Sequence, residues 1–478
     1  MRKNFRVCFL SLLLVMTSLR AVEARDIYVR LAEGVSSVTI TSDGPLKIVD
    51  AANKTHSPGK SISLTRSGSS AVVGKTKAPL PLRISGGGLL GYNGRKYRGG
   101  FFVTREFILI NVLDVEDYLR GVLPAEASSK WPEEYLKIQA IISRTYGVRQ
   151  SLNRSARGYD VGDSTSDQVY RGAGVETAAT DRAIRATEGE IVTWRNELAF
   201  TPFHSDSGGY TATNAHVWGK NLPYLTGVRE PVEYQSPHSG WTARIPASQL
   251  QAALAKIGVG VGQVREVRVS EVDAGGRAIN FTFVGSAGSA SVKSSLFRTA
   301  IGPNVLKSTM LTGGAPVENG TPGAAGASES AWPIADESDF LPRAPAPTSN
   351  TPMSETEEGR LTRMTSDGFF TAAELMDMLM NPEKRKGYLY IGIQRGGSGR
   401  AAAPGVSLPK TRPDTSMPAL RAGQVITGKD GYFVFQGRGW GHGVGLSQWG
   451  AQALVKKGWK AERVLEYYYP GTTVRKFK

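Results

Sequence analysis

The chain has 478 residues, of which 40% are hydrophobic and 21% are charged, and it carries a formal net charge of +16. This length is enough for two or three domains, each with its own buried core. The composition is that of an ordinary globular protein and excludes a disordered or fibrous chain.

The first residues predict an export signal. MRKNFR is basic, Phe9–Met16 is a short apolar run, and Val22-Glu23-Ala24 offers the small residues that a signal peptidase cuts after. The run is shorter than the roughly 20 apolar residues that span a bilayer. We expect residues 1–24 to be a signal peptide cut near Ala24, with an uncleaved anchor as the alternative. The protein is then exported, to the periplasm or cell envelope.

Cysteine and charge use narrow the function further. Cys8, the single cysteine, lies in the predicted signal, so the exported protein would have no disulfide, cysteine–zinc site or cysteine nucleophile. Removing the signal takes away four basic residues and one acid, which lowers the net charge from +16 to +13. A basic exported protein suits an anionic partner such as a cell-wall polymer, although a solvated basic surface is an equally good interpretation. We expect no nucleic-acid partner and no stable membrane insertion after signal cleavage.

Residues 25–113 predict a β-rich region, because short runs such as IYVRLA, SVTITS and LRISGG alternate apolar with polar residues between turn signals. The pattern changes after residue 114. Trp131-Pro132-Glu133-Glu134 predicts a helix start, and the run that follows is apolar nearly all round, which indicates a buried helix. Lys137 and Arg144 lie seven residues apart, on one face of this helix, and need partners there.

The remaining chain alternates short strands and helices up to residue 312. Residues 313–421 are rich in Pro, Ala, Gly, Ser and Thr, which predicts a flexible insertion. A small ordered island is expected at 366–394, where Thr371 and Glu374 form a capping box before a helix and a strand starts at Gly387. The ordered chain resumes at 422 and continues to 478.

Glu126 is the first candidate for chemistry. It follows the apolar run VLPA, and a carboxyl group among apolar neighbours is kept neutral and can act as a general acid. A surface glutamate or a helix cap is the simpler interpretation of the residues alone. The histidines have no metal-ligand spacing, so we expect no metal and no cofactor. Ser447 fails the G-x-S-x-G pattern, because Trp449 stands at the last glycine.

The segment GRGWGHGVG (437–445) has a glycine at every second position. A period of two predicts an extended strand with its glycines on one face and Arg438, Trp440 and His442 on the other. Glycine lets a backbone or a ligand approach closely, so this face could bind a saccharide. A glycine-rich packing strand is an equally good interpretation.

Several blocks, in this order, resemble the SpoIID/LytB family, the group of the stage II sporulation protein D and the amidase enhancer. They are YLRGVLPAEASSKWPEEYLKIQAIISRTYGV (118–148), GYDVGDSTSDQVYRG (158–172), FHSDSGGYTATNAHVWG with NLPYLTGV (203–228), and GRGWGHGVGLSQWGAQALVKKG with VLEYYYPGTTV (437–474). The resemblance covers roughly residues 26–312 and 422–478. It implies an α+β protein: a β-rich N-terminal part (25–113) and a mixed α/β SpoIID-like core (114–312 and 422–478), with a buried helix next to the active-site glutamate.

The resemblance also implies a function. The family's sporulation members are lytic transglycosylases that act on peptidoglycan strands whose stem peptides have been removed, and the matching position of their catalytic glutamate is Glu126. The same matching implies a set of substrate-binding residues, namely Lys137, Arg144, Gln168, Tyr170, Ser205, Ser207, Trp440 and His442. The implied partners are the glycan strands and a cell-wall amidase. The implied alternative is a non-catalytic peptidoglycan-binding enhancer of an N-acetylmuramoyl-L-alanine amidase.

This sequence departs from the family in two places. Many members carry cysteines in the block at 158–172, and some hold zinc there, whereas Gly162 and Asp167 stand at the corresponding positions here. We expect packing or hydrogen bonds to replace that metal. The insertion at 313–421 is also additional to the family pattern.

Overall fold

The computed structural model describes residues 26–152, 158–164, 167–312, 361, 386–389 and 422–477. The predicted signal peptide, the predicted helix that opens at Thr371 and most of the predicted insertion lie outside these residues. Lys386–Leu389 is helical, so the strand predicted from Gly387 is wrong at its start. Among the described residues, none of the helices has the length and apolar character needed to cross a membrane.

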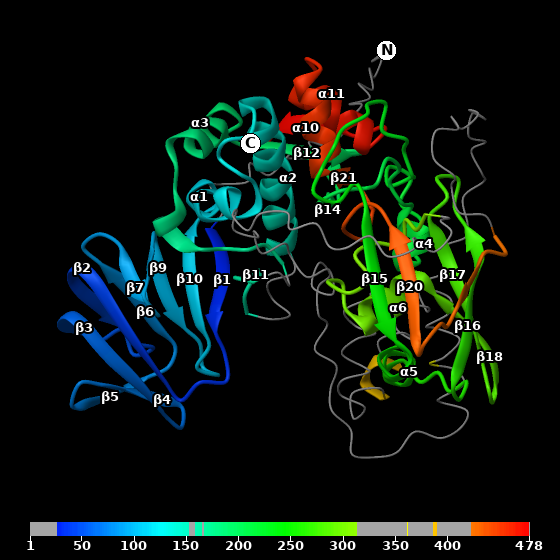
Figure 1. Ribbon diagram of the computed structural model, residues 1–478. Helices are drawn as coiled ribbons and strands as arrows, with labels where there is room; N and C mark the ends of the chain where they lie inside the picture. Colours follow the sequence, from blue (N-terminus) through cyan, green and yellow to red (C-terminus); the bar gives the residue numbers. More distant parts are fainter. Residues whose placement is uncertain are drawn as a thin grey trace, which may run out of the picture.

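The N-terminal lobe is built on a large, mostly antiparallel sheet, drawn in blue in Figure 1. Its strand order is β11-β1-β10-β9-β6-β2-β3-β4-β5, with β7 and β8 paired beside β2. The strands are β1 (Asp26–Ala32), β2 (Ser37–Val49), β3 (Thr55–Ser67), β4 (Ser70–Val73), β5 (Thr76–Pro79), β6 (Leu82–Gly86), β7 (Leu90–Tyr92), β8 (Arg95–Tyr97), β9 (Gly100–Val103), β10 (Leu109–Asp114) and β11 (Val161–Gly162). The predicted β-rich region is confirmed.

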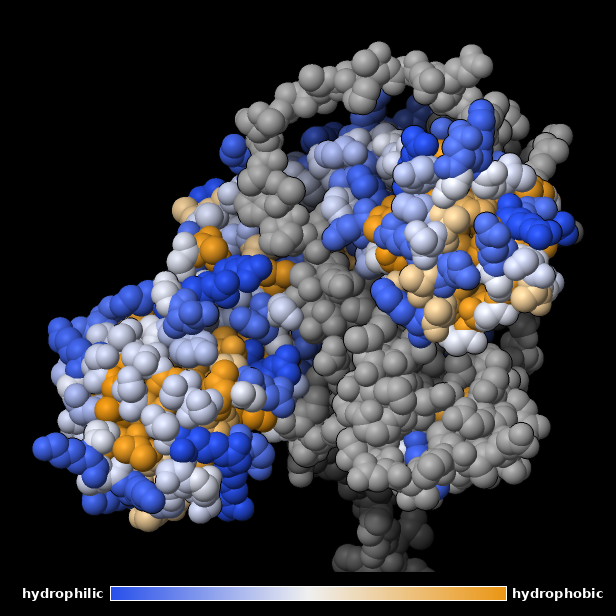
Figure 2. Space-filling view, turned by 60° about the horizontal axis from the view of Figure 1, so that its bottom comes forward, coloured by the Kyte–Doolittle hydropathy of each residue, from blue (hydrophilic) through white to orange (hydrophobic). Residues whose placement is uncertain are grey.

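The alternation of residues along these strands explains how the sheet is placed. In β2, Val38, Ile40 and Leu46 are buried, whereas the residues between them are mostly exposed. The inner face packs on the core, and the outer face meets water. In Figure 2, hydrophilic residues accordingly spread over this lobe, on the left, with hydrophobic ones between them.

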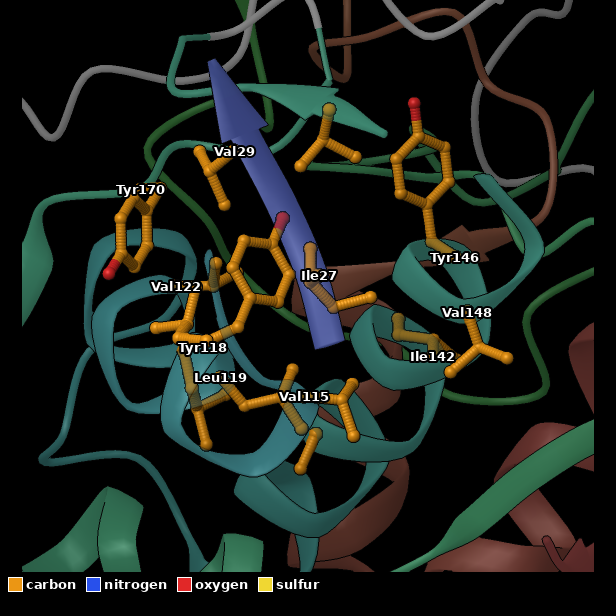
Figure 3. Packing of buried hydrophobic residues seen from close by; sticks show 14 of the residues in the cluster. Ile27, Val29, Val115, Tyr118, Leu119, Val122, Ile142, Tyr146, Val148 and Tyr170 are labelled. Atoms are coloured by element: carbon orange, nitrogen blue, oxygen red, sulfur yellow. The ribbon is translucent and has the colours of Figure 1, made fainter. Parts of the chain in front are cut away.

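Helices cover the edge of this sheet. They are α1 (Val115–Glu126), α2 (Glu133–Ser151) and α3 (Ala178–Ala186). Figure 3 shows Ile27 and Val29 of β1 packed among Tyr118, Val122 and Ile142 of the first two helices. The buried helix α2 begins after Pro132, as predicted.

The helix α1 was not predicted, although a local signal marks its start. The Asp114 side chain caps the helix by accepting a hydrogen bond from the Glu116 N–H at 2.8 Å. Glu116 and Asp117 follow in the first turn, where negative charge is favoured. Pro124 inside the helix obscured the pattern.

The C-terminal residues pack against the same hydrophobic core as the sheet and the helices α1 and α2, which is the first of two cores in the described chain. They form α10 (Gln448–Lys456), α11 (Ala461–Tyr468) and β22 (Thr473–Lys476), and β22 pairs with β12 (Glu190–Trp194), which also pairs with β13 (Glu197–Leu198). In addition, β14 (Phe203–His204) runs parallel to β21 (Leu446–Ser447). Contacts between distant parts of the sequence therefore build the helical region at the top of Figure 1.

A second hydrophobic core gathers residues 241–311 and 422–437, on the right of Figure 1. Phe281, Phe283, Phe297 and Phe435 pack against one another in it. Its elements are β15 (Trp241–Pro246), α5 (Ala247–Lys256), β16 (Val264–Val272), β17 (Ala278–Gly285), β18 (Gly288–Lys293), α6 (Ser294–Ile301), β19 (Val425–Thr427) and β20 (Tyr432–Gly437). The sequence patterns predicted several of these elements, but not that they form a separate core. The strands and helices together confirm the predicted α+β class.

Candidate active site

Glu126 is the last residue of α1. The helix stops here because Ala127 adopts an extended conformation, while its N–H still bonds to the Leu123 carbonyl. The Glu126 carbonyl accepts a hydrogen bond from Nε2 of Gln448, at the start of α10, at 3.1 Å. The end of α1 is therefore held by a residue more than 300 positions away, directly after the glycine-rich segment.

The Glu126 carboxyl group is half-buried, and its Oε1 accepts a hydrogen bond from the Val169 N–H at 2.8 Å. Burial raises the pKa of Glu126 to about 7, although the Val169 N–H and the nearby positive charge of Arg171 both act to lower it. The protonated form is therefore well populated near neutral pH. The direction of this shift is the one expected of a carboxyl group among apolar neighbours.

Residues 167–172 hold the Glu126 side chain in place through three contacts with α1. The Val169 N–H binds the carboxyl group, Gln168 Oε1 accepts from the Tyr118 hydroxyl at 3.0 Å, and the Arg171 N–H donates to the Gly121 carbonyl at 3.0 Å. Gly121 is required there, because a Cβ at this position would lie 2.4 Å from the ring of Tyr170. The Gln168 Nε2 is buried and has no hydrogen-bond partner among the described residues.

A hydrogen bond joins Gly162 and Asp167, the two positions that the family resemblance matched to cysteines. The Gly162 N–H donates to Asp167 Oδ2 at 2.8 Å, and the Tyr146 hydroxyl donates to the other oxygen of Asp167 at 2.8 Å. Asp167 is buried, so these bonds satisfy a carboxylate that would otherwise be costly to bury. Asp167 thereby links β11 to α2.

Aromatic side chains surround the contact between α1, α2 and α10. Trp131 lies edge-on to Trp449, with ring centroids 5.3 Å apart, and to Tyr135 at 4.6 Å. Both tryptophans are half-buried, so each keeps part of its surface toward solvent. The Tyr135 hydroxyl donates to Gln139 Oε1 at 2.9 Å. The sequence patterns did not mark these two tryptophans as site residues, although Trp449 directly follows Gln448, which bonds to the Glu126 carbonyl.

The structure gives the two predicted cations of α2 partners within the fold. Lys137 pairs with Glu134 at 2.8 Å. Arg144 is fully buried and forms two hydrogen bonds of 2.7 Å with the Glu116 carboxylate and one of 3.0 Å with the Glu190 carbonyl. Arg144 thereby ties α2 to α1 and β12. Both cations thus have the partners that they need on a buried helix. Arg144 bonds to Glu116 and Glu190, and none of these contacts is with the Glu126 carboxyl group.

The glycine-rich segment is not the extended strand that its period of two predicted. β20 ends at Gly437, and Gly439, Gly441, Gly443 and Gly445 all have positive φ values, between 72° and 131°. Side chains other than glycine rarely adopt this conformation. A Cβ at Gly445 would also lie 2.1 Å from the Pro202 carbonyl. The alternate glycines therefore let the segment wind closely past the neighbouring backbone.

The predicted site residues of this region lie mainly in buried contacts between segments. His442 accepts a hydrogen bond from the Val444 N–H at 3.0 Å, has a second bond with the Phe203 backbone, and packs on Trp218. The Ser205 carbonyl accepts from Trp449, and the Ser207 N–H donates to Ser447. These contacts hold the glycine-rich segment and the residues after it against β14 and the residues that follow it.

Two further predicted residues lie apart from one another. Trp440 is half-buried, with His238 against its ring at 4.6 Å and the Lys307 ammonium 5.3 Å above it. Tyr170 is buried, and its hydroxyl donates to Asn111 at 2.8 Å. Of the predicted residues, Gln168 is held at the helix that ends in Glu126. It accepts from Tyr118 on this helix, and the next residue, Val169, binds the Glu126 carboxyl group.

A second pair of buried acids, Asp206 and Glu230, was missed in the sequence. The Tyr234 hydroxyl lies 2.9 Å from Asp206 Oδ1 and 2.7 Å from Glu230 Oε2, and the Tyr468 hydroxyl donates to Glu230 Oε1 at 2.7 Å. One hydroxyl hydrogen forms only one full hydrogen bond, so a proton on one of the acids would complete both contacts. Burial raises the pKa of Glu230. Burial thus favours the protonated form of Glu230, in which its hydroxyl can donate to Tyr234 while Tyr234 donates to Asp206.

Comparison with known proteins identifies the segment around Glu126. Residues 104–194, from the end of β9 to β12, match the family model named SpoIID, stage II sporulation protein. This segment is therefore similar to the SpoIID family. It contains Glu126, the helices α1 and α2 and the segment at 167–172. The resemblance inferred from the sequence is confirmed.

Curated relatives match longer parts of the chain. An uncharacterized protein of Brachyspira hyodysenteriae is 31% identical over 224 residues, 46% of this chain and 60% of that protein. The amidase enhancer of Bacillus subtilis is 24% identical over 362 residues, 75% of this chain and 40% of the enhancer. Stage II sporulation protein D of Bacillus subtilis is 32% identical over 158 residues, 30% of this chain and 46% of that protein. The chain thus spans 60% or less of the length of these relatives.

Proposed function

We propose that this protein is an exported lytic transglycosylase that cleaves the bonds between N-acetylmuramic acid and N-acetylglucosamine in peptidoglycan strands without stem peptides. The observation that carries the proposal is the Glu126 carboxyl group. It is half-buried, its pKa is raised to about 7, and the Glu126 backbone carbonyl is bonded to Gln448, which directly precedes the half-buried Trp449. An acid that is protonated near neutral pH can donate its proton to a glycosidic oxygen.

The hydrogen bonds of Glu126 indicate which oxygen carries the proton. Oε1 accepts the Val169 N–H, so it is occupied as an acceptor on that side. A carboxylic acid whose carbonyl oxygen accepts from a backbone amide keeps its hydroxyl on the other oxygen. Oε2 is therefore the oxygen that would meet the substrate.

One carboxyl group is enough for this reaction. Glu126 first donates its proton to the oxygen that links the two sugars, and the bond from this oxygen to C1 of the muramyl residue breaks. The resulting carboxylate then takes the proton of the muramyl C6 hydroxyl, whose oxygen bonds to C1 and closes a 1,6-anhydro ring. The acid ends the cycle protonated. Because no water is added, the second carboxylate of hydrolytic glycosidases is not needed.

Product analysis tests the proposal. Glycan strands treated with an amidase are incubated with the protein, and the products are separated and weighed by mass spectrometry. We expect ends 18 Da lighter than hydrolysed ends, because an anhydro ring lacks one water. Hydrolysed ends, or intact strands, would contradict the proposal.

A second candidate function is supported by a different observation. The match to the amidase enhancer extends over 75% of this chain, well beyond residues 104–194. In this alternative, the protein binds peptidoglycan without cleaving it and enhances a cell-wall amidase. It predicts a rise in amidase rate that persists after Glu126→Gln, together with no release of anhydro ends.

A further inference from the structure

Arg171 differs from the other arginines around α1. Arg98 pairs with Glu176 at 2.6 Å, Arg120 with Asp181 at 2.6 Å and Arg144 with Glu116 at 2.7 Å. Arg171 is half-buried, and its guanidinium has neither a hydrogen bond nor an ion pair with any residue of the described chain. A partly desolvated guanidinium without a carboxylate is unfavourable unless an anionic group binds to it.

Backbone hydrogen bonds fix the position from which the Arg171 side chain extends. Arg171 lies two residues after Val169, which binds the Glu126 carboxyl group, and its own N–H is bonded to the Gly121 carbonyl of α1. The side chain therefore starts from the wall of the site itself. Asp163, the other acid influenced by its charge, already pairs with Arg95 at 3.7 Å. This leaves Arg171 as a cation available to a ligand beside Glu126.

We propose that Arg171 binds the carboxylate of a muramic acid that carries no peptide, and thereby selects this glycan over one whose carboxyl group is amidated. Removing the stem peptide converts the amide of the lactyl group into a free carboxylate. A guanidinium forms two parallel charged hydrogen bonds with a carboxylate but loses this geometry and the charge attraction with an amide. This assignment rests on the proposed function, since it names the group of the same substrate that the site recognises.

Binding of the carboxylate has a consequence for the acid. The charged or titratable side chains that influence Glu126 are Arg171, Tyr118 of α1 and Tyr135 of α2. Burial keeps both tyrosines neutral, because it raises the pKa of each well above its ordinary value. Arg171 lowers the pKa of Glu126, so a bound carboxylate that offsets its charge raises that pKa again. The correct substrate thus favours the protonated acid that cleaves it.

Two matched substrates and three variants test the assignment. The substrates are amidase-treated glycan and the same glycan after its carboxyl groups are converted to primary amides with carbodiimide and ammonia. The variants are Arg171→Gln, Arg171→Lys and the control Arg66→Gln, at an exposed arginine of β3 with no ion pair among the described residues. For the wild type and Arg66→Gln, kcat/KM should be about 10- to 100-fold higher on the free carboxylate. Arg171→Gln should treat both substrates alike, and Arg171→Lys should recover part of the preference.

A pH readout distinguishes recognition from a merely structural role. Without Arg171 the pKa of Glu126 rises in the free enzyme, so the alkaline limb of the kcat/KM profile of Arg171→Gln should move to higher pH. The profile of Arg66→Gln should not move. A preference for the carboxylate that survives in Arg171→Gln, or an unmoved limb, would overturn the assignment.

Calorimetric binding to Glu126→Gln protein separates this assignment from the proposed function. Glycan binding that prefers the carboxylate and is lost in Glu126→Gln/Arg171→Gln supports the role of Arg171, even if the wild-type protein cleaves nothing. Equal binding of both glycans by Glu126→Gln protein would refute it, even if the wild-type protein is a transglycosylase.

Discussion

Glu126 and Glu230 are two carboxyl groups with the same electrostatic perturbation and different surroundings. Burial raises the pKa of both. Glu230 is enclosed: Tyr234 and Tyr468 bind its two oxygens, and Gly450 leaves no space beside it. Glu126 is only half-buried and has one backbone N–H on Oε1. A raised pKa therefore marks a cost of burial, whereas an oxygen left for a ligand marks a site for chemistry.

The largest difference is expected in activity. Glu126→Gln keeps the shape of the side chain but cannot donate the proton, so release of anhydro ends should fall by about two to four orders of magnitude. Glu230→Gln should keep nearly full activity, because a glutamine can accept from Tyr468 and donate to Tyr234, as the protonated Glu230 does. Glycan cleavage by both variants checks this. An inactive, folded Glu230→Gln would show that the enclosed acid also takes part in catalysis.

The next effect is on stability as a function of pH. In the folded protein the pKa of Glu126 is about 7, above its ordinary value of 4.5, so the folded state holds this proton more tightly. The stabilisation is complete below pH 4.5 and is lost as the pH rises through about 7. Glu126→Gln removes this dependence and should be more stable than the wild type at pH 8, by up to about 3 kcal/mol.

Urea unfolding of both proteins at pH 5 and pH 8 measures this effect. The gain in the free energy of unfolding should be larger at pH 8 than at pH 5. A gain that is the same at both values would mean that burial does not perturb Glu126.

A third effect tests how tightly Glu230 is enclosed. In Gly450→Ala the new Cβ would lie 1.9 Å from Glu230 Oε1 and 2.3 Å from the Tyr468 hydroxyl, so the pocket must expand. We expect a loss of about 1–3 kcal/mol in the free energy of unfolding. Gly174→Ala is the matched control, because a Cβ there meets nothing within 4 Å. Thermal unfolding by calorimetry compares the two, and equal midpoints would show that Glu230 is not confined.

The smallest effect is expected at Tyr468. Tyr468→Phe removes the hydroxyl that donates to Glu230 Oε1 but keeps the buried ring. The loss should be about 1 kcal/mol, the usual net contribution of one hydrogen bond. The same change in Glu230→Gln protein should cost a similar amount, because the glutamine carbonyl takes the place of Oε1. A double-mutant cycle of urea unfolding measures whether the two costs agree.

The sequence predicted what depends on local patterns. The alternation in β2 and the proline and acids before α2 specify their elements directly, so the β-rich lobe and the buried helix were found. Glu126 was selected because the blocks around it resemble those of the SpoIID/LytB family. Its raised pKa could not be read from the sequence, because it results from burial in the folded protein. The helix α1 was missed because Pro124 interrupts its pattern.

The remaining features depend on contacts between distant segments. The period of two at Gly439–Gly445 suggested a strand, yet Gly439, Gly443 and Gly445 have positive φ values and lie against atoms distant in sequence, such as the Pro202 carbonyl beside Gly445. The Asp206–Tyr234–Glu230 contact joins residues 28 and 4 positions apart, to which Tyr468 adds a partner 238 positions from Glu230. No local pattern encodes such contacts.

The second core leaves the first through β15 and returns through β20, and the pairing of Trp241 with Gly437 places the points of departure and return opposite one another. Paired residues on antiparallel strands have Cα atoms only about 5 Å apart. This single stem therefore carries the chain from the first core into the second and back. The second core is nevertheless fastened beside the stem, because Arg277 donates to the Ser207 carbonyl at 2.7 Å and the Gly441 N–H donates to the Lys307 carbonyl at 3.0 Å.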